Sequence, residues 1–343
     1  MNALLSLLLA SALPAASPAS IPTQPNVLWV VVDDLGWHDV GFRSHEILTP
    51  NVDALREGGL ELTQYYVQSV CSPSRAAFLT GRYPLHNTVN DWIQVKKASA
   101  LPLNETLLPE VLKQSGYATH AVGKWHLGFY KWKHTPTFRG FDSFYGFYSG
   151  GEDYFEHTSA GGYDMHHDAG PNCGNGCSRV AVEAQGRYST KVFSEQAVKV
   201  IENHNASRPL FLYLAYQAVH SPAQVPASYR DRYNATIPDM KRRTFAGMLS
   251  CMDEGLGNVT AALKSRGLSD DLLVIFTTDN GGPIFTGDAI GASNYPLKGG
   301  KHSIWEGGTR GTAVFWSSKR KPPAPSATYS NLMHAADWVP TLI

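Results

Sequence analysis

The chain contains 343 residues, of which 43% are hydrophobic and 17% are charged. This composition is typical of a globular protein with a sizeable core and excludes a disordered chain. The 29 basic and 29 acidic residues cancel to a formal net charge of zero. That balance gives no support for nucleic acid or a polybasic membrane contact, so we expect neither as a partner.

The N-terminus has the pattern of a secretory signal peptide. An apolar run from Ala3 to Leu13 is followed by small residues and prolines. We therefore predict that residues 1–19 are a signal peptide, cleaved near Ala16 or Ala19. A plain apolar tail is the alternative interpretation. The run is too short to span a membrane, and no other segment of the sequence reaches that length, so no membrane span is expected.

Four Asn-X-Ser/Thr sequons agree with passage through the secretory pathway, because such sequons are N-glycosylation acceptors. The predicted sites are Asn104, Asn205, Asn234 and Asn258.

The four cysteines have different expected roles. Cys173 and Cys177 flank a short Gly-rich segment and could pair, because an oxidising compartment favours disulfides. Cys251 lies in a predicted helix and is expected to be a buried apolar thiol. Cys71 is left without an obvious partner. It could be a buried thiol, half of a disulfide, a thiolate nucleophile or a residue that becomes modified.

Apolar strands alternate with helices along the chain. The run Asn26–Asp34 is apolar until it ends in two carboxylates, as expected of a strand buried on both faces. Further strands are predicted at 117–125, 209–220 and 271–280, and helices at 49–59, 108–116, 187–204 and 245–263. This alternation predicts an α/β fold with a large, mostly parallel mixed sheet sandwiched by helices. We expect a long irregular excursion at 146–186 and a surface loop at 319–327.

Oxygen-rich pairs follow two of the predicted strands, namely Asp33-Asp34 and Asp279-Asn280. In open α/β sheets, ligands bind beyond the carboxyl ends of the strands, so these side chains are expected at one edge. Hard oxygen ligands suit a divalent cation such as Ca²⁺ or Mg²⁺. For either pair alone, a turn or a helix cap is the simpler interpretation. Two pairs at the ends of two apolar strands favour a metal site.

Lysines and histidines occupy comparable positions. Lys124 and His126 follow one predicted strand, and His220 follows another. A glycine-rich segment adds Lys298, Lys301 and His302. Taken singly, each lysine is most simply a solvated surface charge, and each histidine is most simply a core or surface residue without a function. Together they indicate an anion site in which charge neutralisation and proton transfer are available.

The segment CSPSRAAFLTGR resembles the sulfatase signature, in which C-x-P-x-R is followed by L-x-G-R. The match fixes Cys71, Pro73, Arg75, Leu79, Gly81 and Arg82. The segments NVLWVVVDDLGWHDVG, GKWHLG, TTDNGG and EGGTRG are also similar to sulfatase motifs and occur in the family's order. The resemblance runs from about Asn26 to the last residue. Three longer segments are most similar to the arylsulfatase B, I and J branch of the family.

The resemblance implies an alkaline-phosphatase-like sulfatase fold and a role for Cys71. In the family, the formylglycine-generating enzyme oxidises the signature cysteine to formylglycine in the endoplasmic reticulum. The hydrated aldehyde is a geminal diol. One of its oxygens attacks sulfur to give a covalent sulfo-enzyme intermediate, and the other, once deprotonated, expels sulfate. Cys71 is therefore expected to be the modified nucleophile.

The resemblance also implies roles for the other candidate residues. One Ca²⁺ would be bound by Asp33, Asp34, Asp279, Asn280 and the modified Cys71. Arg75 would stabilise the diol or its alkoxide. The substrate would be held by Lys124, His220 and Lys301. His220 would also protonate the leaving alcohol, and His126 would take the proton from the second hydroxyl. Lys298 is less suited, because the family's lysine aligns with Lys301.

As the resemblance implies, residues 26–343 form the N-terminal catalytic domain of a sulfuric ester hydrolase. We expect this domain to be truncated at its C-terminal end, because the family's chains continue into a smaller subdomain. The expected substrate is an aryl sulfate or a sulfated sugar such as N-acetylgalactosamine 4-sulfate, in a lysosome or outside the cell. Two alternatives are a phosphate or phosphonate ester hydrolase on the same fold and a non-catalytic fragment that binds glycans.

Overall fold

The computed structural model of the chain describes residues 24–170, 177–285, 287 and 289–343. The predicted signal peptide at 1–19 and the cysteine at position 173 lie outside these ranges. Among the described residues, no helix is both long and apolar enough to span a membrane.

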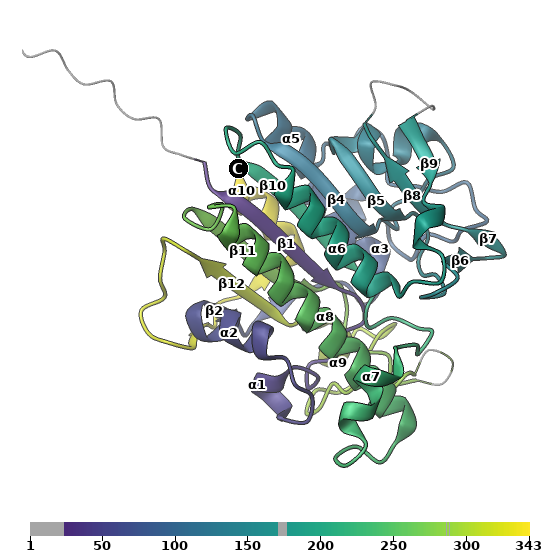
Figure 1. Cartoon of the computed structure of the whole chain (residues 1–343), viewed down its shortest axis with the longest axis vertical. Coiled ribbons are helices and arrows are strands. Elements are labelled where there is room, and N and C mark those ends of the chain that lie inside the picture. The colour runs from purple at the N-terminus through teal and green to yellow at the C-terminus, as the bar shows by residue number, and fades with distance from the viewer. Residues whose placement is uncertain (1–23, 171–176, 286, 288) are drawn as a thin grey trace, which may run out of the picture.

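A mixed β-sheet runs through the centre of the molecule (Figure 1). In the described part of the chain it has ten strands, in the order β13-β2-β12-β11-β1-β10-β4-β5-β8-β9. The strands are β1 Asn26–Val32, β2 Leu60–Leu62, β4 Ala118–Lys124, β5 Ser143–Phe147, β8 Met165–Asp168, β9 Ser178–Val180, β10 Leu210–Tyr216, β11 Leu272–Thr278, β12 Ala313–Ser317 and β13 Ala327–Tyr329. The central strands β11, β1, β10, β4 and β5 are parallel, while β12 and β8 flank them in the antiparallel sense. Two short ladders lie apart, β3 Tyr65–Tyr66 with β14 Met333–His334, and β6 Thr158–Ser159 with β7 Gly162–Tyr163.

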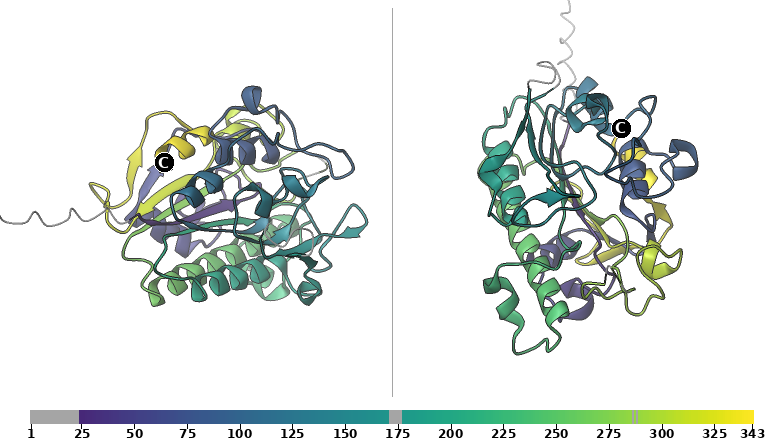
Figure 2. Two further views of the ribbon diagram at one scale, coloured as in Figure 1. Left: turned by 90° about the horizontal axis from the view of Figure 1, so that it is seen from above. Right: turned by 90° about the vertical axis from the view of Figure 1, so that its right-hand side faces the viewer.

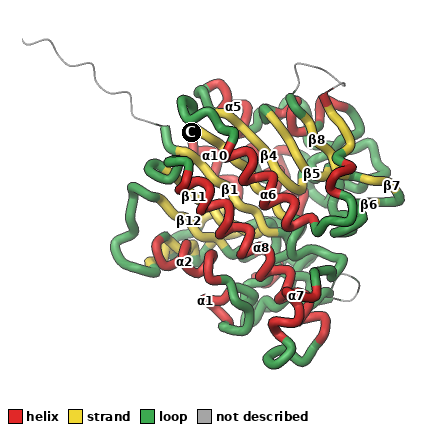
Figure 3. Tube along the Cα trace, viewed as in Figure 1, coloured by secondary structure: helices red, strands yellow, loops and turns green. Residues whose placement is uncertain are grey.

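Helices cover both faces of this sheet (Figures 2 and 3). On one face lie α2 Pro50–Gly58, α6 Ser189–Glu202 and α8 Met240–Ser265, and on the other α3 Cys71–Thr80, α5 Leu108–Gln114 and α10 Trp338–Leu342. The shorter helices are α1 Gly41–Ser44, α4 Pro84–Asn87, α7 Ala227–Arg230 and α9 Glu306–Thr309. Single 3₁₀ turns are η1 Trp132–His134, η2 Pro136–Arg139, η4 Val182–Ala184, η5 Asp231–Tyr233 and η6 Ala335–Asp337.

The core is divided into two by the sheet, and β1 shows how. Its side chains alternate between the faces, so Leu28 and Val30 pack with α6 and α8 while Trp29 and Val31 pack with α3 and α10. Trp29 is completely buried and lies edge-on to Trp338, with ring centroids 5.9 Å apart. Burial on both faces explains why the strand is apolar at every position instead of at alternate ones.

The structure confirms the predicted α/β architecture and the presence of each strand and helix predicted from the sequence, with three differences. Strand β10 ends at Tyr216, four residues before the predicted end. Helix α8 begins at Met240, five residues before the predicted start, because the Asp239 side chain accepts a hydrogen bond from the backbone N–H of Arg242 at 2.7 Å. The excursion expected at 146–186 is less irregular than predicted, since β8 and β9 extend the main sheet there. Strands of three or four residues carry too little periodicity to be recognised.

One glycine decides how closely β4 approaches β10. Gly123 has φ of +102°, and a Cβ atom placed there would lie 1.9 Å from the carbonyl oxygen of Ala215 on β10. A side chain at this position would therefore push the two strands apart. Because Gly123 precedes Lys124, the close approach also fixes where the Lys124 side chain leaves the sheet.

We predict that Gly123→Ala lowers the free energy of unfolding by about 3 kcal/mol or more, because the methyl group collides with backbone that cannot move aside. Gly116→Ala is the matched control, since Gly116 has a similar φ of +92° but nothing within 4 Å of the added Cβ. Its expected loss is about 1 kcal/mol, from backbone strain alone. Denaturant titrations measure both, and equal losses would contradict the packing described for β4 and β10.

Candidate active site at the carboxyl edge of the sheet

The parallel strands deliver the candidate residues to one edge of the sheet. Val32, the last residue of β1, is in register with Thr278 on β11 and Tyr216 on β10. The pairs Asp33-Asp34 and Asp279-Asn280 therefore emerge side by side, as the sequence predicts. Lys124 ends β4 at the same edge, one strand beyond β10.

Three buried carboxylates are paired with three buried cations at this edge. Asp33 forms an ion pair with Lys124 and lies 3.6 Å from the Arg75 guanidinium. A second ion pair joins Asp279 to Arg75 at 2.8 Å, and a third joins Asp34 to Lys301 at 2.9 Å. None of these charges could be buried alone without a large desolvation cost.

The charge states of these groups follow from their neighbours. Burial raises the pKa of Asp34, but Lys301 and then His220 outweigh it, so the pKa lies below its usual value. Burial lowers the pKa of Lys301, but Asp34 outweighs it and the pKa is raised. Burial also lowers the pKa of Arg75, but Asp279 and Asp33 outweigh burial and the pKa is raised. Lys301 and Arg75 therefore stay charged.

Cys71 is the first residue of α3, and its buried side chain lines a cavity. Its Sγ is 3.1 Å from Nδ1 of His126, and the other ring nitrogen of His126 lies 3.0 Å from the carbonyl oxygen of Ile93. A carbonyl only accepts, so Nε2 carries the proton and Nδ1 presents a lone pair toward Cys71. Burial, followed by Lys124 and Arg75, lowers the pKa of His126 well below its usual value, which keeps the ring neutral.

His220 approaches the same group of residues from the segment after β10. Its Nε2 is 3.8 Å from Oδ2 of Asp34, and its Nδ1 lies 2.7 Å from the carbonyl oxygen of Ser221. Burial, followed by Lys301, lowers its pKa. The predicted residues Cys71, His126, His220 and Lys301 thus line one cavity of about 500 Å³.

Two oxygen atoms at this edge suit a divalent cation. Within the described part of the chain, Oδ1 of Asp33 and Oδ1 of Asn280 are buried and have no hydrogen-bond partner. The amide nitrogen of Asn280 donates to Oδ1 of Asp34 at 2.7 Å, which leaves the amide oxygen unused. Ligand atoms of Asp33, Asp34 and His220 all lie within 4.8 Å of one another. Buried oxygens without partners are costly unless something binds them, so the residues fit a hard cation such as Ca²⁺.

Loops complete the wall of this cavity. Residues between Gly150 and Ala160, in the excursion that the sequence predicts, contribute to it. Trp92 and Ile93 also line it and were not predicted, because no motif marks them and they reach the cavity through loop packing. Lys298, predicted to be less suited than Lys301, lies with its ammonium 3.9 Å from the Trp305 ring centroid and does not line the cavity.

The remaining cysteines and sequons have the expected surroundings. Cys177 is disulfide-bonded, whereas its expected partner lies outside the described residues. Cys251 is a buried free thiol, and burial raises its pKa to about 12. The four sequon asparagines, Asn104, Asn205, Asn234 and Asn258, are all exposed, so their glycosylation stays a prediction that the surface permits.

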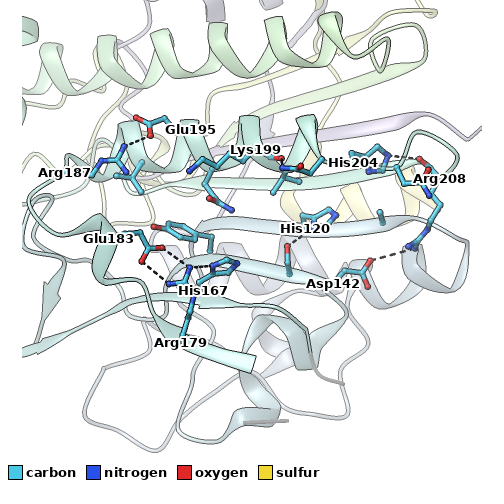
Figure 4. A pocket seen from close by; sticks show the side chains of 18 residues that line it. His120, Asp142, His167, Arg179, Glu183, Arg187, Glu195, Lys199, His204 and Arg208 are labelled. Carbon is cyan, nitrogen blue, oxygen red and sulfur yellow. Dashed lines mark hydrogen bonds and ion pairs between the residues drawn. The ribbon is translucent and has the colours of Figure 1, made fainter. Parts of the chain in front are cut away.

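A larger cavity of about 630 Å³ lies away from the candidate site (Figure 4). It is lined by α6 and by residues near the starts of β4 and β5, whereas the candidate site lies at the ends of the strands. Its arginines have carboxylate partners within the cavity wall, such as Arg187 with Glu195 and Arg179 with Glu183 (Figure 4). We therefore assign it no part in the chemistry.

Comparisons with solved structures confirm the fold. The structure titled "Ps i-CgsB in complex with k-i-k-neocarrahexaose" superposes with a TM-score of 0.84 and 34% identity, over 93% of this chain and 71% of that one. The PsFucS1 sulfatase from Pseudoalteromonas superposes with a TM-score of 0.79 and 27% identity, over 93% and 67% of the two chains. The alkaline-phosphatase-like sulfatase fold expected from the sequence is therefore confirmed.

Sequence comparisons give the family. Arylsulfatase J of Mus musculus is 41% identical over 329 residues, which are 94% of this chain and 52% of that protein. N-acetylgalactosamine-6-sulfatase of Homo sapiens is 32% identical, over 86% of this chain and 57% of that protein. The chain thus spans between half and three fifths of the length of these relatives. The family model described as Sulfatase matches residues 25–343, and the chain belongs to the sulfatase family.

Proposed function

We propose that the chain is the catalytic part of an enzyme that hydrolyses sulfate esters, so that an ester and water give an alcohol and sulfate. The observation that carries this proposal is the position of Cys71. Its Sγ lies against the lone pair of His126, in a cavity to which Lys301 also contributes, next to the buried carboxylates. A nucleophile, a base and cations in one cavity are what transfer of an anionic sulfuryl group requires.

Cys71 would act after conversion to formylglycine by the formylglycine-generating enzyme. The hydrated aldehyde supplies a geminal diol, so that one oxygen can bond to sulfur and the second can later expel sulfate. The complete signature around Cys71 supports this conversion, as does its position at the first turn of a ten-residue helix. The helix N-terminus favours negative charge on the nucleophile.

One Ca²⁺ would be held by the oxygens of Asp33, Asp34, Asp279 and Asn280, together with an oxygen of the modified Cys71. When bound, it supplies Lewis-acid stabilisation of negative charge. The unpartnered oxygens of Asp33 and Asn280 support this assignment. Arg75, which is buried and bonded to Asp279, would stay beside the nucleophile and stabilise its anion.

Lys124 and Lys301 would bind the sulfate oxygens. Their ion pairs with Asp33 and Asp34 hold the two ammonium groups in fixed positions at the edge of the sheet. Such positioning stabilises charge in the transition state without reorganisation during the reaction.

The two histidines would move protons at opposite ends of the reaction. Nδ1 of His126 faces Cys71 with its lone pair and would accept the proton of the second hydroxyl. His220 lines the same cavity and would donate a proton to the leaving oxygen. The two proton transfers are thus assigned to two different histidines, one acting as base and one as acid.

The proposed substrate is a sulfated sugar, with N-acetylgalactosamine 4-sulfate in a glycosaminoglycan as the specific candidate. The names of similar proteins support a sugar substrate. One relative is an N-acetylgalactosamine-6-sulfatase, and one similar solved structure is titled as a complex with an oligosaccharide. An aryl sulfate would serve as a simple substrate. We propose action in a lysosome or outside the cell, to which the exposed sequons lend support.

Removal of the nucleophile should abolish turnover. We predict that Cys71→Ala lowers kcat for an aryl sulfate by about a thousandfold or more. Cys251→Ala is the matched control, since Cys251 is also a buried free thiol but lies in α8, away from the cavity. Substantial sulfate release by the Cys71→Ala chain would contradict the proposal, and release of phosphate instead of sulfate from paired aryl esters would favour the phosphatase alternative.

Calcium should stabilise the folded chain. At a concentration 100-fold above the dissociation constant, binding adds about 2.7 kcal/mol to the free energy of unfolding, and therefore raises Tm. We predict that Asn280→Ala removes most of this rise, whereas Asn280→Asp, which keeps the oxygen ligand, retains it. Differential scanning calorimetry with calcium and with a chelator measures the effect. A Tm that does not respond to calcium in the original chain would contradict the metal assignment.

The pH dependence of kcat should show an acidic optimum. His220 must be protonated to donate, and its lowered pKa means that it loses this proton as pH rises through a value below 6.5, so kcat falls on the alkaline side. His126 must be neutral to accept, and its lowered pKa keeps it neutral into the acidic range. A profile that peaks well above neutrality would contradict the assignment of His220 as the proton donor.

Leaving-group dependence separates a proton donor from a merely structural histidine. His220→Ala should slow hydrolysis of a sugar sulfate about 100-fold or more, because the sugar oxygen must be protonated as it leaves. Hydrolysis of a nitrophenyl sulfate should fall much less, since a nitrophenolate leaves without a proton. His86→Ala, at an exposed histidine outside the cavity, serves as the control.

A further inference from the structure

A second cavity opens beside the candidate active site. It measures about 560 Å³ and shares Val95, Ser159 and Ala160 with the cavity that Cys71 lines, so the two cavities adjoin. We call it the side groove and define it by Lys96, Phe129, Tyr130, Lys131, Trp132 and Tyr163. None of the sequence motifs includes these residues, and the proposed chemistry does not use them.

Aromatic rings form much of the wall of the side groove. Tyr130 is 45% exposed and Trp132 is 39% exposed, which is unusual for rings held in a fixed position. Tyr130 stacks on His134 with centroids 4.6 Å apart, and Phe129 stacks on Tyr148 at 5.7 Å. These contacts hold the wall in place before any ligand arrives. An aromatic face offers apolar contact to the C–H face of a sugar ring at little entropic cost.

The charge of the side groove is positive. Lys96 and Lys131 are exposed, and neither forms an ion pair with any residue that the structure describes. The carboxylate in the wall, Asp164, already accepts from the backbone N–H groups of Tyr148 and Ser149 and contacts His166 at 3.0 Å. The ammonium of Lys131 lies 5.5 Å from the centroid of the Tyr130 ring, so charge and ring are side by side. Two lysines thus outnumber one carboxylate that already has partners, and they can attract an anion.

A hairpin stands between the two cavities. Strands β6 and β7 are joined by Ala160 and Gly161, both with positive φ, and Ser159 and Ala160 contribute to both walls. A chain of sugar units that passes this hairpin would have one unit above Cys71 and the next in the side groove. The groove lies beside the catalytic cavity and does not replace it.

We propose that the side groove is the binding site for the sugar unit next to the one whose sulfate is removed. The rings of Tyr130 and Trp132 contact that unit, and Lys96 and Lys131 bind its sulfate or carboxylate. The substrate is then an acidic oligosaccharide instead of a single sulfated sugar. This inference rests on the proposed function, because it takes the unit in the catalytic cavity to be a sulfated sugar.

Binding measured without turnover tests the groove. Isothermal titration calorimetry would compare the monosaccharide N-acetylgalactosamine 4-sulfate, which leaves the groove empty, with a chondroitin 4-sulfate hexasaccharide, on the full chain carrying Cys71→Ala so that neither is consumed. We expect the hexasaccharide to bind about tenfold more tightly, from two exposed charge contacts and the contacts with the two rings. With Lys96→Gln and Lys131→Gln added, this gain should fall to about twofold or less, and Trp132→Ala should reduce it as well. Lys133→Gln is the control, since Lys133 is exposed in the same turn but does not line the groove.

Two results would overturn the proposal. One is an equal affinity for the monosaccharide and the hexasaccharide in the chain with an intact groove. The other is a gain that the lysine substitutions leave unchanged. Sulfate release from the hexasaccharide by the chain with modified Cys71 is measured separately. If sulfate is released but the lysine substitutions do not change binding, the groove proposal alone is rejected. If the lysine substitutions weaken binding but no sulfate is released, the groove proposal is supported and the proposed hydrolase activity is rejected.

Discussion

The structure depends on charge neutralisation at the carboxyl edge of the sheet. Asp33, Asp34 and Asp279 are buried there, and each is tolerated because a buried cation lies against it. The partners come from strand β4, from helix α3 on one face and from a glycine-rich loop far along the chain. The same pairs therefore hold the edge together and place positive charge around Cys71. Loss of one partner would leave its mate buried and unpaired, which commonly costs about 3–5 kcal/mol.

The central sheet could be predicted from the sequence because parallel strands buried on both faces are apolar at every position. Polar residues directly after such strands must meet at one edge of the sheet. The convergence of Asp33-Asp34 with Asp279-Asn280 could therefore be predicted from their positions after the strands. The role of Cys71 did not follow from order, and it depended on the resemblance of its signature. What could not be predicted comes from loops. The carbonyl of Ile93 that orients His126, and the hairpin β6–β7, depend on packing that no local pattern records.

The candidate active site and the side groove would recognise different parts of the substrate. Around Cys71, buried ion pairs and fixed histidines suit one sulfate group and would hold it in one orientation. In the side groove, exposed lysines and half-exposed rings suit a sugar without demanding a particular one. Chemistry would then be fixed by the edge of the sheet, which the sequence motifs mark, and substrate choice by the loops around it. This division follows the general arrangement of α/β enzymes, in which a rigid sheet positions variable loops.

The central claim is that Cys71 is converted to formylglycine, and mass spectrometry tests it most directly. The tryptic peptide that runs from Glu57 to Arg75 contains Cys71 and can be recovered from material secreted by cells that have the modifying enzyme. A mass that corresponds to an aldehyde in place of the thiol is the predicted result. An unmodified or disulfide-bonded cysteine in that peptide would contradict the account, because the cavity would then lack its nucleophile.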